Sequence, residues 1–136
     1  LEAITTLSNM GTPSYLLASA LTAVIGQRLV KMICPDCKKE FEPSKALLKS
    51  LTLPETTDRL YRGKGCDACY HTGYRGRTGI FEILMVTPEL RQLIADNASR
   101  DALLKAAKFR TLADSCKKKV KEGVIAPEEF LRIIRI

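Results

Sequence analysis

Two short motifs organise this chain: Cys34-Pro35-Asp36-Cys37 and, after 28 further residues, Cys66-Asp67-Ala68-Cys69. Each Cys-x-x-Cys pair predicts a tight knuckle with converging sulfurs, and two such knuckles are typical of a closed tetrahedral Zn²⁺ site. Two disulfides, a redox pair and four unrelated buried thiols are the alternatives. The pattern favours structural zinc bound by Cys34, Cys37, Cys66 and Cys69, but on its own it indicates no function.

Length and composition indicate one folded domain, with room for a small satellite. The chain has 136 residues, of which 46% are hydrophobic and 27% charged, as in ordinary globular proteins. Five cysteines without a preceding signal peptide fit reduced, metal-bound thiols in the cytoplasm better than a secreted disulfide framework. Because the chain starts with neither a methionine nor a capping residue, we expect it to begin inside an element of a longer protein.

Residues 3–27 carry no charge and therefore have to be weighed as a membrane span. Polar residues, a glycine and a proline interrupt the stretch, and the apolar run over residues 15–25 is too short to cross a bilayer. We expect instead a buried pair of helices. The first ends at Gly11. The second runs from its N-cap Thr12 to a polar end at Gln27 and is apolar nearly all round, which predicts burial on several sides.

Helix and strand signals alternate through the rest of the chain. Strands are predicted at residues 59–62 and 80–86, and the second is so apolar that we expect cover on both of its faces. Capping Ser or Thr residues and N-terminal prolines predict helix openings. These openings are at Ser44, Thr87, Ser99 and Pro127, and one further helix spans residues 111–122 and stops at Gly123.

Catalytic chemistry is missing from the sequence. The glycine-punctuated basic turn over residues 70–79 lacks the Gly-Lys-Ser/Thr ending of a phosphate-binding loop, and no Ser-His-Asp set is present. His71 is the only histidine. We place it at the surface or just outside the metal ligands, because four sulfurs already satisfy zinc. Cys116 shares an apolar stripe with Leu112 and Val120, which predicts a small buried side chain and not a nucleophile.

The net charge of +7 suggests nucleic acid or an anionic membrane surface as a partner. The basic clusters are scattered, however, and carry no interleaved aromatic residues. We therefore favour solvated faces together with one acidic partner surface that belongs to the rest of a longer protein. The clusters are Lys38-Lys39, Arg75 with Arg77, and Lys117-Lys118-Lys119 with Lys121.

The order of motifs resembles the secretion ATPases of type II secretion and type IV pilus assembly. The similarity covers nearly the whole chain, and its most specific part is the tetracysteine block with its Gly-Tyr-x-Gly-Arg-x-Gly continuation. The matching stretches are residues 10–21 (MGTPSYLLASAL), 27–30 (QRLV), 34–37, 65–69, 72–82 (TGYRGRTGIFE), 90–94 (LRQLI) and 109–112 (FRTL).

This resemblance implies an α+β, mainly helical fold: the C-terminal part of a RecA-like ATPase domain with a small tetracysteine zinc-binding subdomain and a C-terminal helical bundle. It divides the chain into helices from the end of the ATPase core (residues 1–31), the zinc subdomain (32–78), and a strand with C-terminal helices (79–136). In the family, ATP and Mg²⁺ are bound by the Walker A, Asp box, Walker B and His box motifs. All four lie upstream, so this fragment alone would not be an enzyme.

The resemblance also implies partners and site residues. The parent would be a hexameric cytoplasmic motor at the inner-membrane periphery, which contacts its own neighbouring subunits and the cytoplasmic domains of platform proteins. The family's four zinc ligands map onto the four knuckle cysteines, and Arg75, Arg77 and Arg91 are the candidate partner or subunit contacts. Retraction-type relatives usually lack the four cysteines, so an assembly-type motor is favoured. Cys116 departs from the pattern, since a glycine after an acidic residue is expected there.

A second hypothesis from a different class is an independent basic zinc ribbon that binds nucleic acid. The positive charge and the pair Arg75 and Arg77 beside a knuckle motivate it. Such a module would show an affinity that falls steeply with salt. We regard nucleic acid as the less favoured partner.

Overall fold

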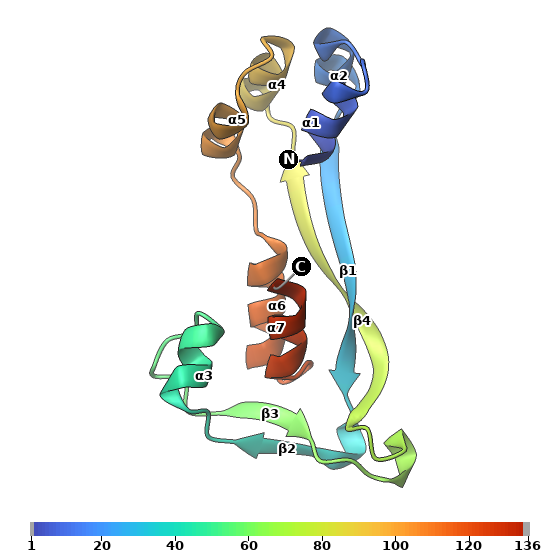
Figure 1. Cartoon of the computed structure of the whole chain (residues 1–136), viewed down its shortest axis with the longest axis vertical. Helices are drawn as coiled ribbons and strands as arrows, with labels where there is room; N and C mark the ends of the chain where they lie inside the picture. Colours follow the sequence, from blue (N-terminus) through green and yellow to red (C-terminus); the bar gives the residue numbers. More distant parts are fainter. Residues whose placement is uncertain (1, 135–136) are drawn as a thin grey trace. The chain divides into compact units, whose positions relative to one another are not determined.

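The computed structural model describes residues 2–134 and shows a mixture of helix and sheet (Figure 1). Within these residues the chain forms seven α-helices, two single-turn 3₁₀ helices and two two-stranded sheets. No helix among them is both long and apolar enough to cross a membrane. The elements are α1 (Glu2–Asn9), α2 (Ser14–Ala20), β1 (Ala23–Ile33), η1 (Pro35–Cys37), β2 (Lys38–Phe41), α3 (Lys45–Ser50), β3 (Leu60–Gly63), η2 (Asp67–Cys69), β4 (Tyr74–Met85), α4 (Pro88–Ala95), α5 (Arg100–Ala106), α6 (Leu112–Lys121) and α7 (Pro127–Ile134).

The chain divides into two compact units that are each discontinuous in sequence. The first holds the residues up to Gly26 together with Glu82–Thr111, and the second holds Gln27–Phe81 together with the residues from Leu112 onward. The longer strands β1 and β4, which pair with each other, run through the boundaries between the units. The expected three-part division at residues 31 and 78 stays a prediction.

The first unit is a cluster of four helices in which α2 packs against α4 and α4 against α5. The Arg91 guanidinium on α4 donates hydrogen bonds to the carbonyl oxygens of Ala18, Ser19 and Leu21 at the end of α2. A cation at that end suits the helix dipole and satisfies carbonyls that have no partner within the helix. The buried side chains of this unit are Ile4, Leu17, Ala18, Leu84, Val86, Leu90, Ile94 and Leu103.

The second unit packs α6 and α7 against the antiparallel pair β2–β3 and against α3. Lys38 lies opposite Gly63 and Phe41 opposite Leu60 in the β2–β3 ladder. Phe130 on α7 is fully buried at the centre. The core is completed by Val30, Leu48, Leu51, Leu53, Leu60, Ile80, Cys116, Val120, Ile125 and Ile133.

Most of the predicted helix openings are confirmed. The Ser44, Thr87 and Ser99 side chains accept hydrogen bonds from the backbone N–H groups of Leu47, Leu90 and Ala102, as N-caps do. Gly123 follows α6 with φ +65°, the left-handed conformation that commonly ends a helix. The strand predicted at residues 59–62 is β3, and Cys116 is fully buried, as expected.

The second predicted helix is wrong beyond Ala20. The segment Ala23–Ile33 is a strand, and it pairs with β4. Its β-branched residues fit a pleated strand better than a helix, and along most of its length the more exposed positions alternate with the more covered ones. The predicted N-cap Thr12 is also wrong, since Pro13 occupies that position without a side-chain cap. Nor is α2 buried all round, because Tyr15 and Leu16 are exposed.

The apolar strand differs from expectation on two counts. It begins at Tyr74 rather than at Ile80, so residues 74–79 of the predicted basic turn belong to the strand. It is not covered on both faces, because Phe81, Ile83 and Met85 are exposed while Ile80 and Leu84 are buried. Among the described residues, β4 in its two-stranded sheet with β1 therefore has one packed face and one exposed face. A run this apolar usually indicates a parallel sheet that is covered on both faces.

Candidate metal centre

The β2–β3 ladder explains how two knuckles separated by 28 residues come together. β2 leaves the first knuckle directly after Cys37, and β3 ends three residues before Cys66. Because Lys38 pairs with Gly63, the end of one knuckle lies beside the approach to the other. Most of the intervening residues form α3 and its loops, whose length does not affect this closure.

The four predicted ligands converge. The sulfurs of Cys34, Cys37, Cys66 and Cys69 all lie within 4.8 Å of one another. The Cys34–Cys66 and Cys37–Cys69 sulfur pairs are 3.9 Å apart, and the Cys66–Cys69 pair is 3.7 Å apart. A tetrahedron with Zn–S bonds of about 2.3 Å has edges of about 3.8 Å. The arrangement therefore has the size of a tetrahedral metal-thiolate site, and all four cysteines are free thiols and not disulfides.

Backbone N–H groups in and beside the second knuckle point at one sulfur of each knuckle. The N–H groups of Cys66 and Gly73 each donate to the Cys69 sulfur at 3.2 Å, and the N–H of Gly65 donates to the Cys37 sulfur at 3.3 Å. Such bonds stabilise thiolate, the form that binds metal. They also fix the directions in which the sulfurs point.

Three of these thiols have shifted pKa values. Burial raises the pKa of Cys37 and, together with the neighbouring thiols, raises that of Cys66 to about 12. Burial also opposes ionisation of Cys69, but the N–H groups of Cys66 and Gly73 outweigh it and lower its pKa to about 6. The lowered pKa favours the thiolate of Cys69, the form that binds metal.

Two glycines allow the knuckles to close. The backbones of Gly63 and Gly73 lie against each other, and a Cβ added at Gly73 would lie 2.7 Å from the Gly63 carbonyl oxygen. Gly73 also has φ +76°, a conformation that other residues rarely adopt. Gly73, the first glycine of the Gly-Tyr-x-Gly-Arg-x-Gly continuation, is thus required both by its close contact and by its backbone angle.

The cysteine cluster has no apolar core of its own. The buried residues grouped at this corner are Cys34, Cys37 and Cys69, with Cys66 partly buried beside them. The leucines, isoleucines and phenylalanine of the second unit belong to the separate core around Phe130. A bound metal would supply the cross-links that side-chain packing does not supply here.

The other predicted site residues lie outside the sulfur cluster. His71 is exposed, and its Nε2 lies 3.1 Å from Asp67 Oδ1, which agrees with a surface position. Arg75 donates to Asp36 within the first knuckle at 2.8 Å. Arg77 is exposed and makes no ion pair with a described residue, whereas Arg91 is used inside the first unit. A role of these arginines in partner contacts stays a prediction.

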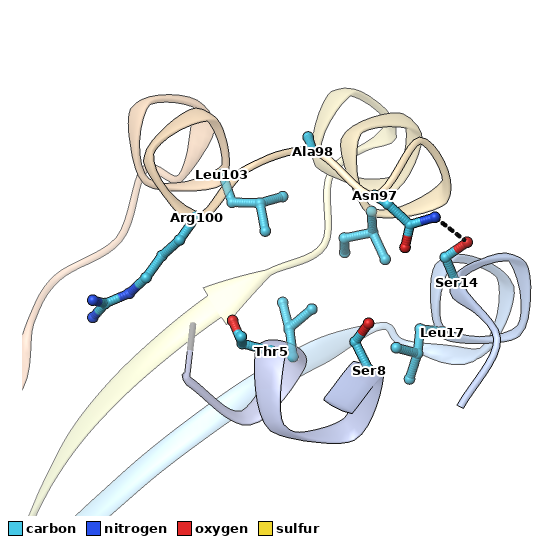
Figure 2. A pocket seen from close by; sticks show the side chains of 10 residues that line it. Thr5, Ser8, Ser14, Leu17, Asn97, Ala98, Arg100 and Leu103 are labelled. Atoms are coloured by element: carbon cyan, nitrogen blue, oxygen red, sulfur yellow. Dashed lines mark hydrogen bonds between the residues drawn. The ribbon is translucent and has the colours of Figure 1, made fainter. Parts of the chain in front are cut away.

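A separate cavity of about 180 Å³ lies in the first unit between α1, α2 and the α4–α5 turn (Figure 2). Its polar groups largely bond to one another or to the chain. Ser14 donates to the Ala95 carbonyl and accepts from Asn97, and Arg100 pairs with Glu2. The lining has neither a nucleophile beside a base nor a set of metal ligands. It consists of Ile4, Thr5, Ser8, Ser14, Leu17, Ile94, Asn97, Ala98, Arg100 and Leu103.

Comparison with known proteins identifies the family. The sequence profile described as "Type II/IV secretion system protein" matches residues 1–132, nearly the whole chain. The chain belongs to this family. Among its relatives, the type II secretion system ATPase E of Vibrio cholerae is 39% identical over 136 residues, which cover 98% of this chain and 27% of that protein. The type IV pilus assembly ATPase PilB of Thermus thermophilus is 37% identical over 96% of this chain and 15% of its own length.

The secretion-family chain therefore spans about a quarter or less of the relatives' length. The expected resemblance is confirmed, and the independent nucleic-acid-binding module is not favoured.

Sequence reasoning missed Lys31, Glu129 and Arg132, which meet on one side of the second unit. Glu129 was interpretable from sequence only as an acidic residue in a helix first turn, since its partner Lys31 is 98 residues away.

Proposed function

We propose that this chain is the C-terminal portion of an ATPase that powers type II secretion or type IV pilus assembly, and that it carries a structural Zn²⁺. The converging sulfurs of Cys34, Cys37, Cys66 and Cys69, at the spacing of a tetrahedral metal site, are the observation that carries the metal assignment. Family membership supports the motor. The parent would bind ATP and Mg²⁺ through motifs upstream of this chain.

The wider architecture belongs to the same proposal. The first unit would extend a RecA-like ATPase core, and α6 and α7 would form part of a C-terminal helical bundle. The parent would work as a homohexamer in the cytoplasm, at the periphery of the inner membrane, and would contact the cytoplasmic domains of platform proteins. In this scheme the zinc subdomain, residues 32–78, is a docking and coupling element with no nucleotide site of its own.

Within this zinc subdomain, individual residues have separate roles in binding the metal. Cys69 would bind the metal as a thiolate, because backbone N–H groups lower its pKa, and the other three thiols would complete the site. The N–H groups of Gly65, Cys66 and Gly73 would hold the thiolates in place. A closed site of four thiolates supplies cross-linking only, since it leaves no open coordination position for a substrate.

Two measurements test this function. Elemental analysis of the purified chain should give one zinc per chain. Iron is quantified alongside zinc, because tetrahedral sites made only of sulfur also suit iron. ATP hydrolysis should be absent from the 136-residue chain and present in the parent protein that includes the upstream sequence. Turnover by the chain alone, after rigorous purification, would contradict the proposal, as would a chain that binds no metal.

A further inference from the structure

A cavity of about 270 Å³ in the second unit is lined by three cations. Its walls are Leu29 and Lys31 on β1, Arg77 on β4 and Arg132 on α7. Leu29 and Lys31 lie two positions apart on the same face of their strand. Three separate elements therefore bring positive side chains to one hollow, away from the cysteine cluster.

Arg132 is held in place by a buried carboxylate. Its Nη2 and Nε lie 2.9 and 3.3 Å from the two Glu129 oxygens, and Nη2 also donates to the Leu29 carbonyl. Glu129 in turn accepts a hydrogen bond from the Lys31 backbone N–H at 2.8 Å. The guanidinium is thus oriented but half exposed, with 48% of its side chain accessible.

The other two cations have no carboxylate partner among the described residues. Lys31 lies over the Tyr74 ring, 5.4 Å from its centroid, and Arg77 is exposed. Glu129 compensates one of the three charges. The exposed Glu128 is also close: after burial, its negative charge is the next cause that raises the pKa of Tyr74. Even with both carboxylates counted, the hollow keeps an excess of positive charge.

We propose that this cavity binds an acidic segment of a partner protein, with one carboxylate held among Lys31, Arg77 and Arg132. Guanidinium groups bind carboxylates through paired hydrogen bonds, and an oriented one loses less entropy on binding. Leu29 distinguishes this ligand from a bare inorganic anion. Its side chain is 53% exposed at the wall of the cavity and offers an apolar contact that phosphate cannot use. The inference rests on the proposed docking role of this chain.

The test is a titration of the zinc-loaded 136-residue chain with the peptide acetyl-Glu-Leu-Glu-Leu-amide, followed by NMR. Shift changes should concentrate on Leu29, Lys31, Arg77 and Arg132. The same peptide with Gln in place of Glu should bind several-fold more weakly. Affinity should also fall as salt rises from about 20 to about 200 mM.

Arg77→Gln should weaken binding about three-fold or more, since the side chain has no hydrogen-bond or ion-pair partner among residues 2–134 whose loss would disturb the fold. Lys39→Gln removes an exposed cation that does not line the cavity and should leave binding unchanged. Equal binding of the Gln peptide, equal loss in the two variants, or shifts produced as strongly by inorganic phosphate would overturn the inference. Zinc content and the folded spectrum are recorded first, so failure of the proposed function appears as missing metal and failure of this inference as a zinc-loaded chain without binding.

Discussion

Glu129 on α7 accepts a hydrogen bond from the Lys31 backbone N–H at 2.8 Å and thereby ties the last helix to strand β1, 98 residues earlier in the chain. Glu129 is the one buried charged residue among those that the structure describes, and Arg132 neutralises it. Replacing Glu129 by Ala leaves the Lys31 N–H and Arg132 without their acceptor. We expect a loss of about 2–3 kcal/mol in the free energy of unfolding, measured by urea denaturation. The exposed neighbour Glu128→Ala should change stability by less than about 0.5 kcal/mol.

The same carboxylate makes stability depend on pH. Burial raises the pKa of Glu129, but hydrogen bonds from Arg132 and the Lys31 N–H outweigh it, so the pKa in the folded chain lies below its usual range. A lowered pKa contributes stability above the unfolded value of about 4.3, and this contribution is lost as pH falls through the folded value. The stability difference between the wild type and Glu129→Gln should be constant above about pH 5 and shrink below about pH 4. Comparison of the two proteins cancels the acid-driven loss of metal, and a gap that widens on acidification would refute this assignment.

Removing one proposed ligand should affect one region. Cys66→Ser should lose zinc and loosen residues 34–78, while the helices at 88–134 partly survive, because the packed cores around Phe130 and Leu90 do not include the knuckles. Elemental analysis and hydrogen exchange provide the measurements. Cys116→Ala is the matched control, since it removes a buried thiol from the apolar core and should keep one zinc per chain. Unchanged zinc stoichiometry in Cys66→Ser would contradict the ligand set.

Gly73→Ala should destabilise the knuckle far more than an ordinary glycine substitution. The new Cβ meets the Gly63 carbonyl oxygen at 2.7 Å, and the backbone has φ +76°. We expect a cost of about 2–4 kcal/mol in thermal unfolding and faster zinc release to a chelator. Gly11→Ala isolates the backbone contribution, because its φ is +86° but no atom lies within 4 Å of the added Cβ. Its cost should be about 1 kcal/mol. Equal effects of the two substitutions would remove the contact argument.

The five thiols should react in a fixed order. Cys116 is fully buried in the core around Phe130, which does not include the knuckles, and burial raises its pKa to about 11. It should therefore stay shielded at pH 8 when the metal is removed. A thiol reagent should label few groups in the zinc-loaded chain, four after chelation, and Cys116 only after denaturation. Mass spectrometry of the labelled peptides gives the assignment. Rapid labelling of Cys116 in the folded protein would contradict its place in the core.

Local chemistry made much of this fold predictable. Ser44, Thr87 and Ser99 cap their helices because a hydroxyl next to a free helix end is a local feature of the sequence. The spacing of the cysteines likewise predicted which side chains converge. The β1 strand was missed because Leu17, Leu21, Val24 and Ile25 also fit a helical stripe, and pairing with β4, roughly fifty residues away, decides between them. The cationic hollow could not be predicted, since Leu29, Arg77 and Arg132 are brought together only by tertiary packing.

At the corner formed by the two knuckles, the buried cluster consists of cysteine side chains, whereas elsewhere in the chain leucine and isoleucine side chains form the buried clusters. With the proposed Zn²⁺ bound, the stability of this corner would depend by mass action on the supply of metal as well as on the amino-acid sequence. While free zinc stays well above its Kd, each tenfold fall in its concentration would remove about 1.4 kcal/mol from the free energy of unfolding. Thiol oxidants would act in the same direction by consuming ligands. Zinc starvation or thiol oxidation would therefore loosen the knuckles before the apolar cores around Phe130 and Leu90.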